Sequence, residues 1–541
     1  MTPAGEGASS LQDRGVCRQV PVVGIGASAG GLEALEEFFA HVPVNSGMAY
    51  VVVQHMSPTH PIALVELLAR SSGVPVVEAI DGMPVVPDRA YVIPPGCYLS
   101  ITDGVLNLSA PDGRPSLHNT VDLFLRSLAA ARHEEAIGVI LSGSGTDGTL
   151  GIRAIKGEGG LVVVQDPTTA AYDGMPTSAI ATGLADLVLP VHEMPRRIME
   201  YVSAEGRTLP ALASPGAMEP LRSLLALMRA QTGVDFSYYK QTTIVRRVQR
   251  RMIVRGIASI PEYVRRARED PQEGQALFRE LLINVTSFFR DAEAFRVLSD
   301  RVLPHLLEGK GRDDALRVWV PACSSGEEPY SIAIVIREYL ARTGRDVQCR
   351  IFATDLDPQA IDTARAGVYP RNISVDVSPE RLARFFHRQG SGFRIGQAIR
   401  ETVAFAVHNA LQDPPLGRMD LISCRNLLIY LDAEAQRRLL ERFYFGLVPE
   451  GVLFLGASET VGDGFGMFAP LDRKWRFFVR RERAPQHTEP GTGRLGECPS
   501  ASVSTGHVAP GRTGGQEGCG ERLLEPNPLA VAPRAQPRDL P

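Results

Sequence analysis

The chain has 541 residues, of which 44% are hydrophobic and 22% charged, with a formal net charge of −4 at neutral pH. This length allows two or three domains, each with its own core. A pI near 6.3 excludes a general nucleic-acid-binding protein, and the lack of any apolar run of about 18 residues excludes a membrane span. Seven scattered cysteines favour reduced thiols and offer no zinc-type pair, so we expect a cytoplasmic protein without a bound metal.

The region from Val20 to about Tyr201 alternates short β-branched segments with helical patterns. This alternation predicts a doubly wound α/β domain with a largely parallel sheet, which we place at residues 17–202 after a disordered terminus at 1–16. The expected strands are Val20–Ile25, Tyr50–Val53, Tyr91–Ile93, Ala136–Leu141, Leu161–Val164 and Asp186–Leu189.

Residues 203–220 are rich in proline and glycine and predict a linker. A flexible segment of this length spans about 25 Å, so we expect the flanking domains to move independently. A small helical domain is expected at 221–290, followed by a second α/β domain at 291–482. The remaining residues, 483–541, contain too few aromatic and β-branched side chains to bury a core, and we expect a disordered tail there.

The first α/β domain contains a glycine-rich turn, GIGASAGG, directly after its first expected strand. The turn satisfies the spacing of a dinucleotide fingerprint, but the second strand ends in Gln54 and His55, where such a site needs an acid to hold the ribose. The alternative is a nucleophilic serine, Ser28, on a sharp strand-to-helix turn whose glycines permit a strained backbone. The free N–H groups of the following helix would then lie beside a developing oxyanion.

Two further polar residues follow expected strands of the same sheet. His55 follows the second strand, and Asp147 lies in a glycine-rich turn after the strand that begins at Ala136. Because the carboxyl ends of parallel strands meet at one edge, Ser28, His55 and Asp147 should converge. A serine, a histidine that takes its proton and a carboxylate that orients the imidazole form an acyl-transfer site. Each residue alone is more often structural, so the prediction depends on their shared placement.

Four stretches of this domain, GIGASAGG, VVVQHMSP, LSGSGTDGTLG and VQDPTTAAYDGMPTSAI, resemble the catalytic domain of the chemotaxis receptor methylesterase, the CheB type. The resemblance covers most of residues 20–200. It implies hydrolysis of glutamyl methyl esters on receptors, and deamidation of glutamine, with Ser28 as nucleophile, His55 as general base and Asp147 as orienting acid. Family members commonly carry an amino-terminal phospho-receiver domain, and no receiver-like segment precedes Val20 in this sequence.

The segment RVWVPACSSGEEPYS, from Arg317 to Ser331, has the pattern of a strand, a tight loop of small residues and a helix. Such a loop at the carboxyl end of a parallel strand binds nucleotide-like ligands in Rossmann-like sheets, because small residues let the ligand approach the backbone. A second apolar run ends at Asp355, whose carboxylate can accept both hydroxyls of a ribose. Together these features predict a nucleoside site. An ordinary βα turn followed by a surface acid is the alternative.

A stretch of the helical domain, YYKQTTIVRRVQRRMIVR, carries six cationic residues and no acid. A helix placed for solubility usually mixes the two signs of charge, whereas a stripe of one sign attracts an acidic partner. We therefore expect Arg246, Arg247, Arg250 and Arg251 to bind a glutamate-rich protein helix. A solvated helix face is the alternative.

Residues 221–480 resemble the chemotaxis receptor methyltransferase, the CheR type, through the stretches NVTSFFRDAEAF, VWVPACSSGEEPYSIA, FATDLD and CRNLLIYLD. The resemblance implies methyl transfer from S-adenosylmethionine to receptor glutamates, with Tyr430 lining the methyl-transfer channel. Residues 372–404 are expected to form a strand-rich insertion. The implied cofactor contacts are Asn284, Thr286, Arg290, Glu328, Asp355, Asn409, Ala410, Arg425 and Asn426.

These observations predict a bifunctional enzyme, a protein-glutamate methylesterase of the serine hydrolase type joined to a protein-glutamate O-methyltransferase. Its expected partner is a methyl-accepting chemoreceptor or a similar signalling protein, through which alone it reaches the membrane. The alternative is a signalling scaffold whose catalytic domains have decayed into docking modules, and the intact triad and cofactor residues speak against it. A third interpretation, a dinucleotide-dependent oxidoreductase, needs an acid at the place of His55.

Overall fold

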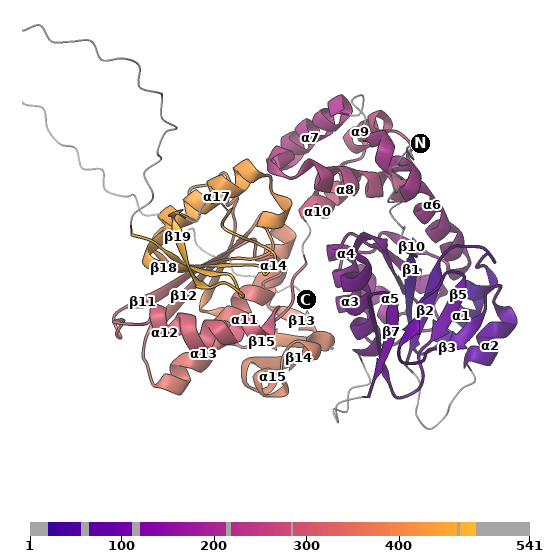
Figure 1. Cartoon of the computed structure of the whole chain (residues 1–541), viewed down its shortest axis with the longest axis horizontal. Helices are drawn as coiled ribbons and strands as arrows, with labels where there is room; N and C mark the ends of the chain where they lie inside the picture. The colour runs from indigo at the N-terminus through magenta and orange to yellow at the C-terminus, as the bar shows by residue number, and fades with distance from the viewer. Residues whose placement is uncertain are drawn as a thin grey trace, which may run out of the picture. The chain divides into compact units, whose positions relative to one another are not determined.

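The computed structural model describes residues 20–55, 64–110, 119–212, 218–282, 285–390, 392–462 and 466–482 (Figure 1). The expected disordered ends at 1–16 and 483–541 lie outside these residues. We call residues 20–212 the first domain, 218–282 the helical module and 285–482 the second domain. Among the described residues, no helix has the length and hydropathy needed to cross a bilayer.

The first domain is built on a seven-stranded parallel sheet in the order β10-β9-β8-β1-β2-β5-β3. Strands β1, β8 and β9 are buried at every position, because helices cover both faces of the sheet. All six strands expected from the sequence belong to this sheet, so the doubly wound fold is confirmed. Its strands are β1 (Val22–Ala27), β2 (Ala49–Gln54), β3 (Val76–Glu78), β5 (Arg89–Val92), β8 (Ala136–Ile140), β9 (Leu161–Gln165) and β10 (Leu187–Leu189).

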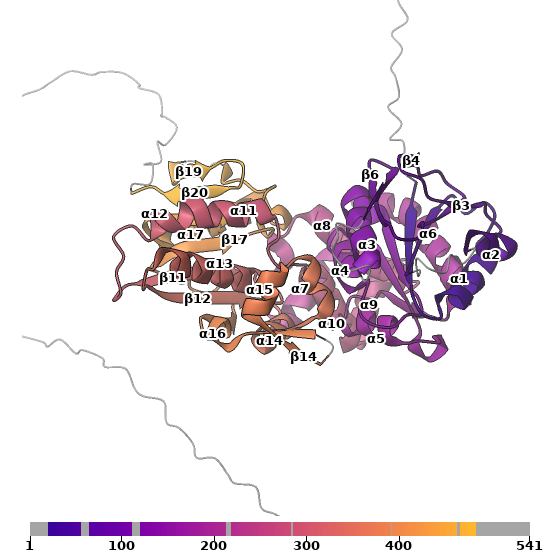
Figure 2. The ribbon, with the colours of Figure 1, turned by 90° about the horizontal axis from the view of Figure 1, so that it is seen from below.

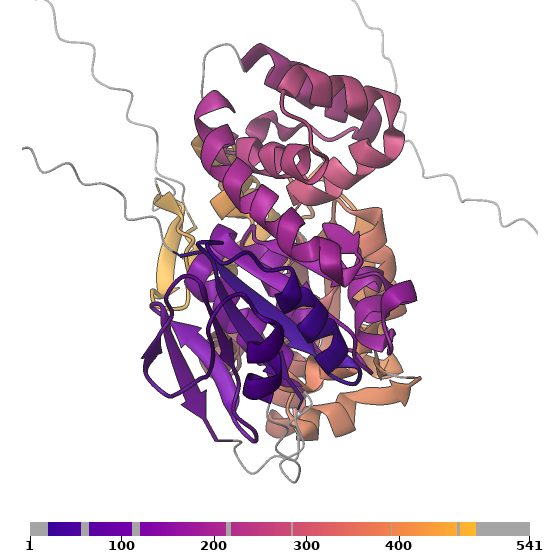
Figure 3. The same ribbon diagram turned by 90° about the vertical axis from the view of Figure 1, so that its right-hand side faces the viewer.

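The helices of the first domain connect these strands, as the indigo and violet ribbon of Figure 3 shows. A small antiparallel sheet of β4 (Met83–Pro84), β7 (Val105–Ser109) and β6 (Tyr98–Thr102) was not expected. Its β6–β7 hairpin turns at Asp103 and Gly104, both with positive φ, which is the Asp-Gly signal of a tight hairpin. The helices are α1 (Gly31–Ala40), α2 (Leu64–Ser71), α3 (Thr120–Arg132), α4 (Thr149–Gly157), α5 (Gly174–Ala181) and α6 (Met194–Leu212).

Helix α6 corrects the predicted linker. Residues 203–212 belong to this helix, and α7 begins at Met218, so the expectation of a flexible segment over 203–220 is wrong for its helical residues. Helix α6 packs along α8, and Arg197 of α6 donates a hydrogen bond of 3.3 Å to the carbonyl of Val254. The helix therefore continues through Gly206 and Pro210 despite their low helix propensity.

The helical module, drawn in magenta in Figure 3, has no strand among its described residues. Its Phe236, Val248 and Tyr263 are fully buried in a hydrophobic cluster that also contains Trp319 and Phe443 of the second domain. Its apolar residues recur at helical spacing, which is why the sequence predicts helices here. The helices are α7 (Met218–Thr232), α8 (Gln241–Val254), α9 (Ile260–Glu269) and α10 (Pro271–Leu282), with a short 3₁₀ turn at Phe236–Tyr238.

The second domain contains a seven-stranded sheet in the order β16-β12-β11-β17-β18-β20-β19 (Figure 2). Strands β16 to β18 in this order are parallel, and β20 and β19 add antiparallel pairs at one edge, so the expected α/β fold is confirmed with a mixed sheet. Its strands are β11 (Ala315–Pro321), β12 (Gln348–Asp355), β16 (Val403–Val407), β17 (Met419–Cys424), β18 (Leu447–Leu455), β19 (Phe468–Asp472) and β20 (Phe477–Arg480).

Two strands of a three-stranded antiparallel sheet lie within the expected insertion at 372–404, and the third, β13, precedes it. The sheet consists of β13 (Val368–Pro370), β14 (Phe386–Gln389) and β15 (Gly392–Ile395), and a 3₁₀ turn at Arg371–Val375 follows β13. The helices of the second domain are α11 (Ala292–Val297), α12 (Leu303–Leu306), α13 (Glu327–Thr343), α14 (Pro358–Ala366), α15 (Pro379–Phe385), α16 (Gln397–Arg400) and α17 (Ala433–Gly446), with a π-helical turn at Leu298–Val302 and a 3₁₀ turn at Leu428–Tyr430.

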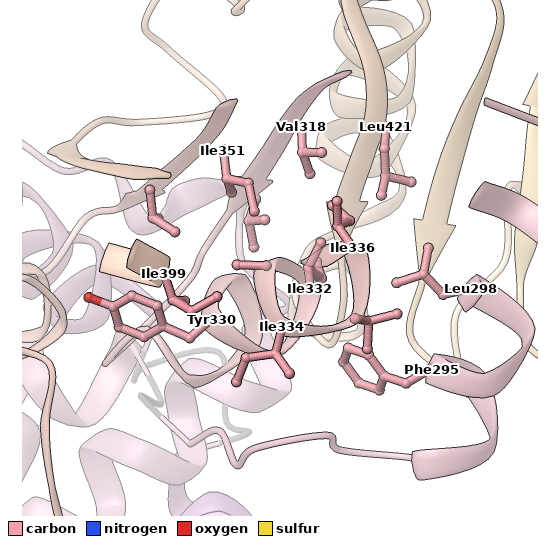
Figure 4. Packing of buried hydrophobic residues seen from close by; sticks show 14 of the residues in the cluster. Phe295, Leu298, Val318, Tyr330, Ile332, Ile334, Ile336, Ile351, Ile399 and Leu421 are labelled. Carbon is pink, nitrogen blue, oxygen red and sulfur yellow. The ribbon is translucent and has the colours of Figure 1, made fainter. Parts of the chain in front are cut away.

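Helix α13 is the central packing element of the second domain (Figure 4). Its Ile332 and Ile336 are at most 1% exposed and share one hydrophobic cluster with Val318 of β11, Ile351 of β12 and Leu421 of β17. Burying a side chain of this size stabilises the fold by about 1.5–3 kcal/mol. The packing fixes the first turn of α13 at the carboxyl edge of the sheet.

Candidate active sites

Ser28, His55 and Asp147 meet at the carboxyl edge of the first-domain sheet. The Oγ of Ser28 lies 3.1 Å from Nδ1 of His55, and Nε2 of the same ring lies 2.8 Å from Oδ2 of Asp147. The structure therefore brings together all three side chains that the sequence predicts. For Nδ1 to take the serine proton, Nε2 must carry the ring hydrogen and donate it to Asp147.

Backbone N–H groups hold the carboxylate of Asp147 in place. Val121 and Asp122, in the first turn of α3, donate hydrogen bonds of 3.0 and 2.9 Å, and Gly148 donates another of 2.9 Å. A helix start favours a negative charge, so these donors suit an ionised carboxylate. Since Asp147 is only 4% exposed, little water competes with His55 for it.

The turn that carries Ser28 is tightly packed. The Ser28 N–H donates to the carbonyl of Ser142 at 3.0 Å, and the Gly31 N–H donates to the Ser28 carbonyl at 2.9 Å. A Cβ added at Gly143 would lie 2.9 Å from the Cβ of Ser28, and Gly30 has a φ of 66°. Both glycines are therefore required by the geometry of the turn.

Ser142 is a functional residue that sequence reasoning missed. Its Oγ donates to the carbonyl of Ala29 at 2.9 Å and accepts from the N–H of Tyr172 at 3.0 Å. Its own N–H donates to Oε1 of Gln165 at 2.8 Å. Ser142 thus fixes the residue that follows Ser28. A serine in a Gly-Ser turn has no local signal that reveals such a role.

The second site is centred on Asp355 at the end of β12. Its Oδ2 accepts a hydrogen bond of 2.7 Å from the Ser324 N–H, and its Oδ1 accepts one of 2.9 Å from the Asp357 N–H. Each carboxylate oxygen keeps a further lone pair, which fits the two hydroxyls of a ribose. Burial raises the pKa of Asp355 to about 6.

The loop between β11 and α13 approaches Asp355 with strained backbone geometry. Ala322, Ser324 and Gly326 have φ values of 55°, 49° and 93°. A Cβ on Gly326 would lie 2.8 Å from the Cβ of Ala364, so only glycine fits this position. Backbone strain of this kind is concentrated at ligand sites. The loop and Asp355 together fit a nucleoside.

Three further predicted cofactor residues form one network. The guanidinium of Arg425 donates to the Arg290 carbonyl at 2.9 Å, to Asp291 at 2.7 Å and to Glu328 at 3.4 Å. Glu328 also accepts a hydrogen bond of 2.7 Å from Ser423, and burial raises the pKa of its carboxyl group. The network places the first turn of α13 and the end of β17 beside the segment that contains Arg290.

The remaining predicted contacts lie nearby or outside the described residues. Asn284 lies outside them, while Thr286 and Ala410 are half-buried. The Asn426 N–H donates 2.9 Å to Glu459, a buried acid that sequence reasoning missed and that also accepts from Gly456 at 2.7 Å. Asn409 follows β16, and its Oδ1 accepts from the Leu411 N–H at 3.0 Å. Tyr430 ends the 3₁₀ turn before α17, and its carbonyl accepts from the Lys240 N–H at 2.8 Å.

Helix α8 does not present the expected basic stripe. Arg247, Arg250 and Arg251 are 7%, 4% and 8% exposed, so the prediction of a free cationic surface is wrong for these three residues. Only Arg246 of the four has a largely exposed side chain, 61% accessible, and it lies 3.3 Å from Glu134.

Acids from distant parts of the chain neutralise the buried arginines. Arg250 pairs with Asp186 of the first domain, and Lys156 of α4 lies 2.5 Å from both Asp186 and Glu280. Arg247 lies 3.2 Å from Glu280, and Arg251 lies 2.6 Å from Glu273. The arginines are therefore held by internal ion pairs, of which Arg250–Asp186 joins the helical module to the first domain. The sequence could not show this, because the acids come from other elements.

Comparisons with known proteins divide the chain in the same order. The CheB methylesterase model matches residues 23–198, the all-alpha domain model of CheR methyltransferase matches 219–282, and the CheR SAM-binding domain model matches 284–477. Chemotaxis protein methyltransferase 1 of Pseudomonas aeruginosa is 39% identical over 243 residues, which are 43% of this chain and 86% of that protein. This chain belongs to the chemotaxis protein methyltransferase family. It carries a CheB-type methylesterase domain ahead of the CheR-type domains, and S-adenosylmethionine is its cofactor.

Two further relatives match different lengths of the chain. An uncharacterized 104.1 kDa protein of Rhodobacter capsulatus is 37% identical over 439 residues, which are 76% of this chain and 46% of that protein. The chain thus spans about half the length of that relative. The crystal structure of the Thermotoga maritima CheB methylesterase catalytic domain is 34% identical and covers 34% of this chain and 98% of that one, with a TM-score of 0.32.

Proposed function

We propose that this chain removes and adds methyl groups on glutamate side chains of a methyl-accepting receptor. The observation that carries the proposal is the hydrogen-bonded series Ser28–His55–Asp147, in a chain that also holds a nucleoside-fitting site at Asp355. The first site supplies ester hydrolysis and the second supplies methyl transfer. The protein acts in the cytoplasm and meets the membrane only through the receptor.

Hydrolysis begins when Nδ1 of His55 takes the proton of Ser28 as Oγ attacks the ester carbonyl. The carboxylate of Asp147 holds the Nε2–H and stabilises the imidazolium. The imidazolium then gives its proton to the methoxy oxygen as the ester C–O bond breaks, so methanol leaves and an acyl-serine remains. Water, deprotonated by the same Nδ1, attacks the acyl group and restores Ser28. A glutamine side chain follows the same course with ammonia as the leaving group.

In the second site the chain's residues bind and orient. The Asp355 carboxylate accepts hydrogen bonds from the ribose hydroxyls, and Arg290 pairs with the carboxylate of the cofactor. Bound S-adenosylmethionine supplies an electrophilic methyl group on a sulfonium. The substrate glutamate is ionised at neutral pH and needs no strong base, so positioning supplies most of the rate enhancement. Tyr430 lines the path of the methyl group.

The protein substrate approaches through exposed residues rather than through the buried arginines of α8. Arg246 keeps an accessible guanidinium and is the remaining candidate of that group for contact with an acidic receptor helix. Its exposed pair with Glu134 is weak, so the guanidinium can exchange that partner for a glutamate of the receptor.

The test follows methyl groups through both reactions. Purified protein is incubated with S-adenosylmethionine, radiolabelled in its methyl group, and receptor-containing membranes, and labelled receptor and released methanol are measured in turn. We expect both products. Asp355→Ala should lower both products, because labelled methanol arises only from labelled receptor, and Ser28→Ala should remove only the second. Labelling of receptor without any methanol release would contradict the esterase assignment.

A further inference from the structure

Asn372 belongs to the 3₁₀ turn of the second-domain insertion, yet its side chain lies among residues of the first domain. Its Nδ2 donates to Oδ2 of Asp122 at 2.5 Å and to Oγ1 of Thr149 at 2.7 Å, and lies 3.3 Å from the Thr146 carbonyl. Asn372 is 2% exposed, so the amide is enclosed by these partners. The opposite orientation of the amide would set Oδ1 against the Asp122 carboxylate.

These partners are the residues that surround Asp147. Asp122 donates its N–H to Oδ1 of Asp147, and Thr146 directly precedes it in the chain. Thr149 closes the same turn, because its Oγ1 donates 2.8 Å to the Thr146 carbonyl. Asn372 thus ties the first turn of α3 to the turn that carries Asp147. Both segments must stay in place for Asp147 to face His55.

The electrostatics of Asp122 show why an amide donor is needed there. Burial and the neighbouring charge of Asp147 raise the pKa of Asp122, which is fully buried. Besides Asn372, the Asp122 carboxylate accepts a hydrogen bond of 2.7 Å from the Gly151 N–H. Losing one of few partners of a buried carboxylate is costly, so the first turn of α3 would shift toward other donors.

We propose that Asn372 is a positioning residue of the esterase, through which the second domain completes the Ser28–His55–Asp147 site of the first. The proposal rests on the esterase function proposed above. It predicts that the esterase is not an independent unit, in contrast to the flexible tethering that the composition of 203–220 suggests. A fragment that ends at residue 212 lacks Asn372 and should hydrolyse esters more slowly than the full chain.

The chain offers a matched control at the same contact. Arg126, also on α3, donates a hydrogen bond of 2.8 Å to Asp376, four residues beyond Asn372. Arg126→Ala therefore weakens the same contact between domains without touching the partners of Asp147. Asn372→Ala removes the donor, and Asn372→Asp keeps the shape of the side chain while replacing the donor with an acceptor.

The experiment measures the reaction of Ser28 in the full-length chain in two ways. The first is the rate of covalent labelling by a fluorophosphonate, which requires an activated serine but no receptor. The second is the kcat and KM of methanol release from a peptide that carries a glutamate γ-methyl ester. S-adenosylmethionine affinity and thermal unfolding report whether the second domain and the fold are intact.

Both Asn372 variants should lose labelling rate and kcat by about tenfold to a hundredfold, the scale of a small misplacement of a catalytic group. We expect KM and S-adenosylmethionine affinity to stay within about twofold of wild type, because the Asn372 side chain contacts residues around Asp147 rather than either ligand site. Arg126→Ala should stay within about twofold of wild type throughout. An equal loss in Arg126→Ala, or wild-type rates in the Asn372 variants, would overturn the inference. An inactive wild-type chain would instead overturn the proposed esterase function.

Discussion

Arg153 of helix α4 donates a hydrogen bond of 3.1 Å to Glu327, which lies 174 residues further along the chain at the start of α13. Glu327 is 2% exposed and also accepts a hydrogen bond of 2.8 Å from Ser325, in the loop that approaches Asp355. Burial raises the pKa of Glu327, and the positive charge of Arg153 opposes that rise. A residue of the first domain thus supports the cofactor loop of the second.

Arg153→Ala should weaken S-adenosylmethionine binding by about tenfold, because an unpaired buried carboxylate reorganises the loop around it. Since removing Arg153 raises the pKa of Glu327 further, the defect should shrink as the pH falls and Glu327 takes up a proton. Calorimetric titration at several pH values measures both effects. In the Glu327→Gln background the same arginine substitution should cost little, and equal losses in both backgrounds would contradict the pairing.

Asp355→Ala should weaken S-adenosylmethionine binding by about 1.5–3 kcal/mol, the usual scale for a hydrogen bond to a charged group. Because the pKa of Asp355 is about 6, affinity in the wild-type chain should also fall as the pH is lowered through 6 and the carboxylate loses its charge. The contribution of the Asp355 carboxyl to the free energy of unfolding changes with pH in the opposite direction to the cofactor affinity. It is greatest below the ordinary pKa of aspartate and is lost as the pH rises through about 6. Unchanged affinity in calorimetry would refute the ribose assignment.

Ser28→Ala should abolish methanol release and leave methyl transfer running, so that methylated receptor accumulates. Loss of a triad member typically costs several orders of magnitude in rate, far more than a change in domain contact. Radiolabelled receptor and methanol, measured in the same sample, separate the two activities. A Ser28→Ala chain that released methanol at the wild-type rate would remove serine catalysis from the proposal.

Arg250→Ala and Arg246→Ala should differ strongly in stability although both lie on α8. The first leaves the buried Asp186 with fewer cationic partners and should cost about 3 kcal/mol or more in the free energy of unfolding. The second removes an exposed pair and should cost less than about 1 kcal/mol. Urea denaturation of the two variants measures the difference. Similar small losses would show that the Arg250 pair is not formed in solution.

The strands and the convergence of Ser28, His55 and Asp147 could be predicted because their signals are local. Each of the three residues lies in a glycine-rich segment or at the end of a strand. The carboxyl edge of a parallel sheet brings such segments together. The pairing of Arg250 with Asp186 could not be predicted, because the two residues are 64 positions apart and no pattern links them.

Long-range contacts also explain the other differences between the sequence predictions and the structure. The glycine and proline of residues 203–212 favour a linker, but the first half of α6 packs against α8 and the helix continues to Leu212. Asn372 had no signal at all, because its role depends on Asp122, 250 residues earlier. The local motifs predict the chemistry, whereas the contacts between domains arise only in the folded chain.

Helix α4 begins two residues after Asp147, and it carries Arg153 to the cofactor loop and Lys156 to Glu280 of the helical module. This one helix therefore links the turn that carries Asp147 to the loop that approaches Asp355. If a ligand at Ser28 strengthens cofactor binding through the Arg153–Glu327 contact, thermodynamic reciprocity requires that bound cofactor strengthens the binding of that ligand by the same free energy.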